Sequence, residues 1–99
     1  MSERVTAGDV VVAFLESCGV EQAFVVISIH NMPVLDAFHR RKKIKFIPTR
    51  SEGGAVNMAD ANARARGCLG VAVSSTGTAA GNACGAIIEA MTAGTPLLH

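Results

Sequence analysis

Two hydrophobic patterns alternate along the chain. Four segments favour helix, through apolar residues spaced three or four positions apart or through a high alanine content. Between them lie short apolar runs rich in β-branched residues, which are typical of strands covered on both faces. Helices are predicted at residues 7–18, 32–41, 53–66 and from the 75–82 segment to about residue 93. Strands are predicted at residues 20–29, 44–48 and 69–74, and a fourth begins at residues 97–99.

This alternation predicts an α/β fold with a parallel sheet and helices on both of its faces. Residues 1–99 are interpreted as one domain. The last strand has only three residues, whereas a buried strand runs to about five. We therefore expect the sheet to be incomplete within this chain.

The first predicted helix carries recognisable end signals. Thr6 is a favoured N-cap residue, and Asp9 can complete a capping box with it. Gly19 is expected to end the helix. The residues predicted to form its apolar face are Val10, Val11, Phe14, Leu15 and Cys18.

The amino-acid composition argues against two classes of binding partner, nucleic acids and membranes. About half of the 99 residues are hydrophobic (49%) and 17% are charged, which is typical of a folded protein. A net charge of +1 gives no electrostatic reason to expect nucleic acid or an anionic membrane. Four Phe without Tyr or Trp offer little surface for stacking bases. No apolar stretch approaches the roughly 20 residues of a membrane helix.

The three cysteines show no paired spacing. Cys18 and Cys84 are expected on apolar helix faces as small buried residues, and Cys68 is expected in a turn. No disulfide or metal pattern emerges, and the polar first residues do not resemble a signal peptide. A reducing, cytoplasmic location is therefore predicted.

Glu52 lies between a predicted strand and a predicted helix. Ligands of open α/β sheets bind at the carboxyl ends of strands, so this position favours a functional role. The alternative is a carboxylate that merely stabilises the first helical turn. Residues 28–30, 49–52 and 74–78 all follow strands, so we expect them to converge on one edge of the sheet. This convergence favours the functional interpretation of Glu52.

Other polar or glycine positions are less specific. His30 follows a strand, where it could exchange protons, cap the next helix or face water. Gly77, Gly81 and Gly85 match neither the Walker pattern nor GxGxxG. Their four-residue spacing instead predicts a flat helix face that can pack closely.

Several short motifs occur in order along nearly the whole chain. They are Cys-Gly-Val-Glu at 18–21, Asn-Met-Pro at 31–33, Leu-Asp-Ala at 35–37, Arg-Ser-Glu-Gly-Gly-Ala at 50–55, Met-Ala-Asp at 58–60, Thr-Gly at 76–77, Gly-Asn-Ala at 81–83 and Thr-Pro-Leu at 95–97. With these motifs the chain resembles the beginning of the pyrimidine-binding domain of thiamine diphosphate enzymes. The resemblance is to the acetolactate synthase and benzoylformate decarboxylase group, whose domain has a flavodoxin-like fold.

The resemblance implies that Glu52 is the essential glutamate of that family. It would bond N1′ of the cofactor's aminopyrimidine, whose imino form then removes the C2 proton of the thiazolium before attack on a 2-oxo acid. Small apolar residues at 53–55 would favour the protonated carboxyl that this bond needs. The cofactor-binding candidates are Ser28, Ile29, Glu52, Thr76, Gly77 and Asn82, and no metal ligand is expected.

The chain also departs from the family pattern. Residues 25–28 read Val-Val-Ile-Ser where relatives usually carry Gly-x-Pro-Gly. Ile29 occupies a position that is often polar in the decarboxylases, and Ser51 stands where many relatives have His. The substrate, and the choice between decarboxylation and carboligation, therefore stay open.

The resemblance further implies a longer protein. Family members have three domains, and a domain absent here holds the diphosphate and Mg²⁺. Their active site lies between subunits, so a homodimer or higher homo-oligomer is expected. We expect the chain alone to bind the cofactor weakly or not at all, and not to catalyse turnover. Two alternatives are a non-catalytic subunit or fragment completing a site in trans, and a flavin- or nucleotide-binding α/β module.

Overall fold

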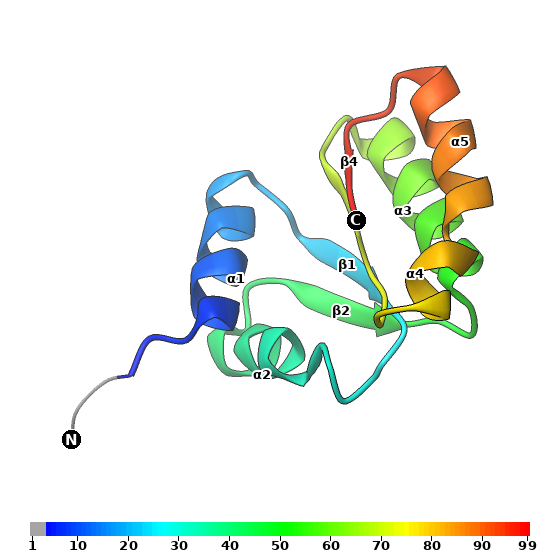
Figure 1. Cartoon of the computed structure of the whole chain (residues 1–99). Coiled ribbons are helices and arrows are strands. Elements are labelled where there is room, and N and C mark those ends of the chain that lie inside the picture. The colour runs from blue at the N-terminus through cyan, green and yellow to red at the C-terminus, as the bar shows by residue number, and fades with distance from the viewer. Residues whose placement is uncertain (1–3) are drawn as a thin grey trace.

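The computed structural model describes residues 4–99 (Figure 1). Its elements, in chain order, are α1 (Ala7–Ser17), β1 (Gln22–Val25), α2 (Met32–Arg41), β2 (Lys45–Pro48), α3 (Glu52–Arg66), β3 (Gly70–Val73), α4 (Thr78–Asn82), α5 (Cys84–Ala93) and β4 (Leu97–Leu98).

The four strands form one parallel sheet in the order β2-β1-β3-β4. Phe24 of β1 lies opposite Ile47 of β2 on one side and Ala72 of β3 on the other. The short strand β4 pairs with β3 through Gly70 and Leu97. The α/β fold with a parallel sheet that the sequence predicts is therefore confirmed.

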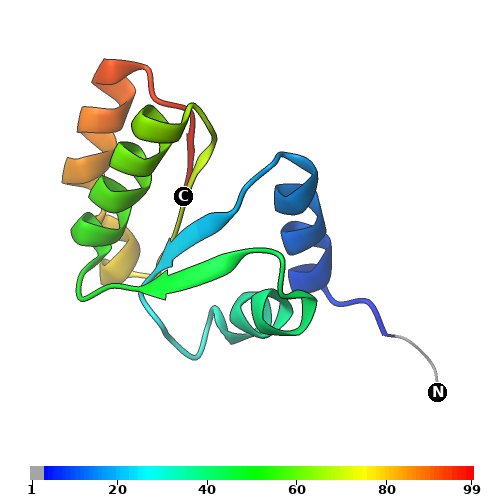
Figure 2. The same cartoon turned by 180° about the vertical axis from the view of Figure 1, so that it is seen from behind.

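Helices cover both faces of the sheet (Figures 1 and 2). Helices α1 and α2 lie together on one face, and α3 and α5 lie together on the other. Each face has its own apolar core. The core on the α1 and α2 side includes Val12, Leu15, Val25, Leu35, Phe38 and Val71. The core on the α3 side includes Phe24, Ala55, Val56, Ala59 and Ala72.

Two glycines allow these layers to approach closely. A Cβ added to Gly8 of α1 would lie 2.6 Å from the carbonyl oxygen of Pro33 in α2. A Cβ added to Gly70 of β3 would lie 2.5 Å from the carbonyl oxygen of Ala59 in α3. Both contacts are with backbone atoms, which can shift only at a high cost in free energy. No larger residue fits at either position without a shift of the packed elements.

The predicted capping box at the start of α1 is confirmed. The Thr6 N–H donates to the Asp9 carboxylate at 2.9 Å, and the Asp9 N–H donates to the Thr6 hydroxyl at 3.1 Å. The same carboxylate contacts the guanidinium of Arg40 in α2 at 2.7 Å. These bonds, led by that of the Thr6 backbone, lower the pKa of Asp9 from 3.8 to about 2.

The predicted apolar face of α1 is wrong in part. Leu15 is buried as expected, and Val12 is also buried, whereas Val10 and Phe14 are each 59% exposed. Residues 10–15 are all apolar, so the sequence does not single out one buried face. Contacts with α2 and the sheet decide which side is covered.

The expectation that two cysteines are buried is also wrong. Cys18 and Cys84 are both exposed. Cys18 is the C-cap residue of α1, and Cys84 begins α5 immediately after a helix break. Helix ends lie at the margin of the packed layers, which explains their exposure. Cys68 lies in a turn, as predicted.

The helix predicted up to residue 93 is two helices, α4 and α5. The break falls at Ala83, whose N–H bonds to the carbonyl of Ala80 at 3.2 Å, a tight 3₁₀-type contact. Glycines weaken helical continuity here. The prediction of a closely packed glycine face is wrong, because a Cβ at Gly81 or Gly85 would meet no atom within 4 Å.

Within residues 4–99, none of the helices is long and apolar enough to cross a membrane.

Candidate functional site

The carboxyl ends of β1, β2 and β3 meet at one edge of the sheet, beside α4 (Figures 1 and 2). Three loops leave this edge, formed by residues 26–31, 49–51 and 74–77. Together with the start of α3 they form what we call the carboxyl edge. The convergence of strand ends that the sequence predicts is therefore present, in the place where open α/β sheets bind ligands.

Glu52 is the first residue of α3 and lies half-buried at the carboxyl edge. The helix begins here because the Ser51 hydroxyl accepts a hydrogen bond from the Gly54 N–H at 3.0 Å. Across the edge, Nδ2 of Asn82 in α4 donates to Oε1 of Glu52 at 3.2 Å. Two predicted site residues are therefore in direct contact. The other oxygen, Oε2, accepts no hydrogen bond from the part of the chain that the structure describes.

Asn31 also belongs to the carboxyl edge, and it was not predicted from the sequence. It is buried, with 6% of its surface exposed. Its Oδ1 accepts a hydrogen bond from the Ser28 N–H at 3.0 Å. Its Nδ2 donates to the carbonyl oxygens of Val26 (2.8 Å) and Ser74 (3.3 Å). The available signal is weak, since an Asn between a strand and a helix is typical of any turn.

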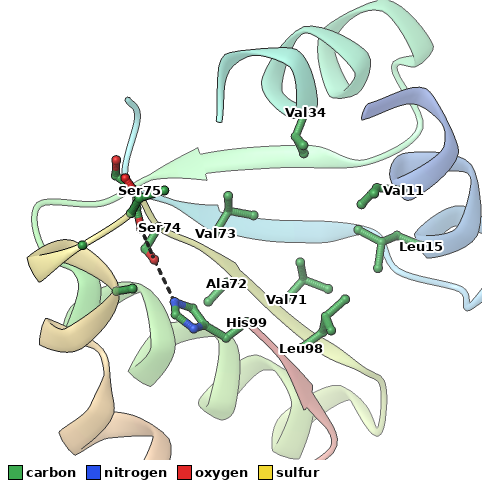
Figure 3. Close-up of a pocket in the computed structure, with 13 residues that line it drawn as sticks. Val11, Leu15, Val34, Val71, Ala72, Val73, Ser74, Ser75, Leu98 and His99 are labelled. Atoms are coloured by element: carbon green, nitrogen blue, oxygen red, sulfur yellow. Dashed lines mark hydrogen bonds between the residues drawn. The ribbon is translucent and has the colours of Figure 1, made fainter. Parts of the chain in front are cut away.

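Further contacts join the ends of the outer strands. Oγ of Ser74 lies 2.9 Å from Nε2 of His99, which follows β4 (Figure 3). The same hydroxyl lies 3.1 Å from the Ser75 carbonyl oxygen, to which it can donate. On the other side, the Thr49 N–H donates to the Val25 carbonyl at 2.8 Å and joins β2 to β1. Hydrogen bonds thus connect the carboxyl ends of all four described strands.

The remaining predicted residues lie on the loops of the edge. Ser28 is half-buried and Ile29 is 85% exposed after β1. Thr76 and Gly77 are exposed before α4, and Gly77 has a φ of 67°, which suits glycine at this N-cap position. Within residues 4–99, none of these four hydrogen-bonds to Glu52. The structure therefore brings Glu52 and Asn82 together and leaves the other four as neighbours on adjoining loops.

A groove of about 650 Å³ opens beside this edge (Figure 3). Its floor is formed by β3, and its walls are formed by α1, α2 and the end of β4. Apolar side chains line most of it, including Val11, Val34, Val71 and Leu98, while residues 74–77 form its polar end. Glu52 and Asn82 lie outside the groove. This groove and the predicted catalytic residue therefore occupy different sides of the carboxyl edge.

An ion-pair cluster around Arg64 lies away from the edge. Arg64 in α3 contacts Asp60 at 2.8 Å and Glu89 of α5 at 3.1 Å, and its hydrogen bond lowers the pKa of the Asp60 carboxyl. This pairing joins α3 to α5 and is structural. His30 is exposed. Residues 4–99 contain no group of three His, Cys, Asp or Glu side chains placed to hold a metal ion.

Curated proteins of two kinds are similar to the chain. It is 38% identical over 91 residues to 2-hydroxyacyl-CoA lyase 2 of Caenorhabditis elegans, which covers 92% of the chain and 14% of that relative. It is 32% identical over 96 residues to acetolactate synthase of Mycobacterium avium, covering 97% of the chain and 16% of the relative. The acetolactate synthase large subunit of Lactococcus lactis is 35% identical over 97 residues, which is 97% of the chain and 17% of that protein.

The chain therefore spans only 14–17% of the length of these relatives. Residues 5–99 also match the family described as "Thiamine pyrophosphate enzyme, N-terminal TPP binding domain". The parallel sheet with helices on both faces agrees with this assignment. The chain belongs to the N-terminal TPP-binding domain family of thiamine pyrophosphate enzymes.

Proposed function

We propose that this chain forms the pyrimidine side of a thiamine diphosphate site, in an enzyme that acts on 2-oxo acids as a decarboxylase or an acetolactate synthase-like carboligase. Glu52 is the residue that activates the cofactor. The observation that carries the proposal is the placement of its carboxyl at the carboxyl edge, with Asn82 bound to Oε1 and Oε2 available to a ligand. Similarity to acetolactate synthases supports the substrate class.

The residues present fit an aminopyrimidine ring. A protonated carboxyl can donate to a ring nitrogen, and the Asn82 bond leaves Oε2 as the oxygen that carries the proton. The backbone at two glycines of the edge is also open to a ligand. The nearest atom to a Cβ at Gly53 would be the Asn82 carbonyl oxygen at 3.8 Å, and a Cβ at Gly77 would meet nothing within 4 Å.

Each residue has a distinct task in this proposal. Thiamine diphosphate, when bound, supplies the electron sink for breaking the bond next to the 2-oxo carbon. Glu52 holds a proton on Oε2 toward the ring nitrogen, and Asn82 fixes the rotation of the carboxyl. Ser28, Ile29, Thr76 and Gly77 line the approach to this carboxyl.

The proposal extends to parts outside this chain. Mg²⁺ and the diphosphate are held by another domain, and the complete site lies between two subunits of a homodimer or larger homo-oligomer. The free cysteines of the described residues support a reducing, cytoplasmic location. Between the two kinds of relative, the acetolactate synthases indicate a 2-oxo acid and the 2-hydroxyacyl-CoA lyase indicates a thioester substrate.

Titration of the ¹⁵N-labelled chain with thiamine diphosphate and Mg²⁺ tests the proposal. A pyrimidine pocket without a diphosphate site is expected to bind with a Kd of about 1 mM, or about 4 kcal/mol. Amide signals of residues 52–54, 76–77 and 82 should shift. Glu52→Ala should weaken binding about tenfold, because loss of the donor leaves a covered ring nitrogen without a partner, which costs about 1–3 kcal/mol.

Glu21→Ala is the matched control, since Glu21 is exposed before the amino end of β1 and pairs with Arg66. It should bind like the wild type. Equal binding by the wild type and Glu52→Ala would contradict the role of Glu52. Tight binding of a flavin or nucleotide that Glu52→Ala leaves unchanged would instead favour the alternative of a flavin- or nucleotide-binding α/β module.

A further inference from the structure

Asn31 is one of three buried polar residues described in the structure, together with Asp9 and Asp60. Both aspartates pair with arginines: Asp9 with Arg40 of the neighbouring helix α2, and Asp60 with Arg64 one turn along α3 itself. Asn31 instead lies at the carboxyl edge and uses its amide on backbone groups. Burial of an amide is unfavourable unless its hydrogen bonds are made, so a fully bonded buried amide points to a specific task.

Capping of α2 does not account for Asn31. It occupies the N-cap position of that helix, yet its side chain makes no capping hydrogen bond. The helix begins with Pro33 in its first turn, where proline needs no capping partner. The amide is directed to the strand ends instead, where it reaches Val26 and Ser74.

The bonds of Asn31 link two loops that are distant in sequence. Its Oδ1 holds the Ser28 N–H of the loop after β1. Its Nδ2 reaches the Ser74 carbonyl, 43 positions away, at the start of the loop after β3. The first loop carries Ser28 and Ile29, and the second carries Thr76 and Gly77. These are four of the proposed cofactor-binding residues.

We propose that Asn31 is a positioning residue that sets the spacing of these two loops and so preforms the cofactor site. The inference rests on the proposed function in that the loops bind thiamine diphosphate. Loops held in the bound arrangement before the ligand arrives lose less conformational freedom on binding. Asn31 therefore raises affinity without touching the ligand.

Asn31→Asp tests the hydrogen bonds between the two loops separately from side-chain packing, because aspartate has nearly the same shape as asparagine. At pH 7 the introduced carboxylate has no proton to donate to the carbonyls of Val26 and Ser74. Acidification to pH 5 returns a donor, since burial favours the protonated form. His30 adjoins Asn31 in the chain and His99 contacts Ser74, so the wild type is measured at both pH values. Asn57→Asp, on the exposed surface of α3, is the matched control.

Two readouts are taken on the full chain. Without cofactor, the amide signals of Ser28 and of residues 76–77 in Asn31→Asp should shift together at pH 7 and return toward wild type at pH 5. With thiamine diphosphate and Mg²⁺, the Kd should rise about tenfold at pH 7, the loss expected for about 1.4 kcal/mol. At pH 5 the affinity of Asn31→Asp should return most of the way to that of the wild type measured at the same pH.

Changes confined to residues 28–30, with 76–77 unmoved, would overturn the proposal. So would an equal loss in Asn57→Asp, or no recovery on acidification. If the wild type binds no thiamine diphosphate, this chain has no cofactor site of its own without the other domain, while the joint movement of the two loops still decides whether Asn31 links them.

Discussion

Asn82 contacts Glu52 through a single hydrogen bond of 3.2 Å on an exposed part of α4. Because the bond is exposed, we expect it to contribute only about 1 kcal/mol to the free energy of cofactor binding. Asn82→Ala should therefore weaken thiamine diphosphate binding roughly fivefold. The same titration of the ¹⁵N-labelled chain that tests Glu52 measures this loss of affinity, and Asn57→Ala on α3 is the control. An affinity equal to that of the wild type would show that the carboxyl needs no support from α4.

Asp9 gives the protein a defined response to acid. Its pKa is about 2 in the folded chain and 3.8 in the unfolded reference. A lowered pKa means that the ionised group stabilises the fold above pH 3.8 and that this stabilisation is lost as the pH falls toward 2. We predict a fall in Tm across this window.

Asp9→Asn should lower the Tm at pH 7 and flatten its dependence on pH below 4. Thermal unfolding by circular dichroism at a series of pH values provides the measurement. Some slope should persist in the variant, because hydrogen bonds from Arg41 and Arg64 also lower the pKa values of Glu16 and Asp60. A slope as steep as that of the wild type would assign the acid response to those groups instead.

Residue-level prediction from sequence worked where the partners are near in the chain. The pairing of Thr6 with Asp9 spans three positions, and its motif is visible in sequence. Asn31 reaches Ser74 across 43 positions, and no local pattern signals such a contact. The contact between Asn82 and Glu52 was likewise not foreseen, although both residues were selected as candidates.

At the level of elements, α2 has its predicted bounds, because Pro33 and a clear amphipathic pattern mark it. Strand β1 is shorter than predicted, at Gln22–Val25 instead of residues 20–29. The apolar run continues past Val25, but Asn31 bonds to Val26 and Ser28 and turns the chain out of the sheet. These side-chain bonds to the backbone accompany the end of the strand, and hydrophobicity alone could not show them.

The two kinds of glycine found in this fold should respond oppositely to alanine. Gly70→Ala forces a Cβ against the Ala59 carbonyl at 2.5 Å and should destabilise the protein by about 1–3 kcal/mol. Gly85→Ala meets nothing within 4 Å inside α5 and should stabilise by up to about 1 kcal/mol through helix propensity. Urea unfolding midpoints provide the comparison. A destabilising Gly85→Ala would reveal a close contact at that helix face after all.

At the scale of the whole molecule, the alternation of strands and helices was enough to predict a parallel α/β sheet. The strand order β2-β1-β3-β4 and the assignment of helices to faces were not predicted. They depend on which apolar surfaces fit together, as in the packing of Phe24 between β2 and β3. The groove beside α1 follows from that arrangement, because residues of α1, α2, β3 and the end of β4 together line it (Figure 3).

An apolar groove of this size should bind a neutral fluorescent dye such as Nile red. Val11 lines it and is 42% exposed, so Val11→Ser removes apolar contact with little change to the core. The loss of roughly 1 kcal/mol of apolar contact should raise the dye Kd about fivefold. Ile88→Ser is the control, because Ile88 is 60% exposed on α5, across the sheet. Equal losses in both variants would mean that the dye binds scattered apolar surface, and that the groove is no distinct site.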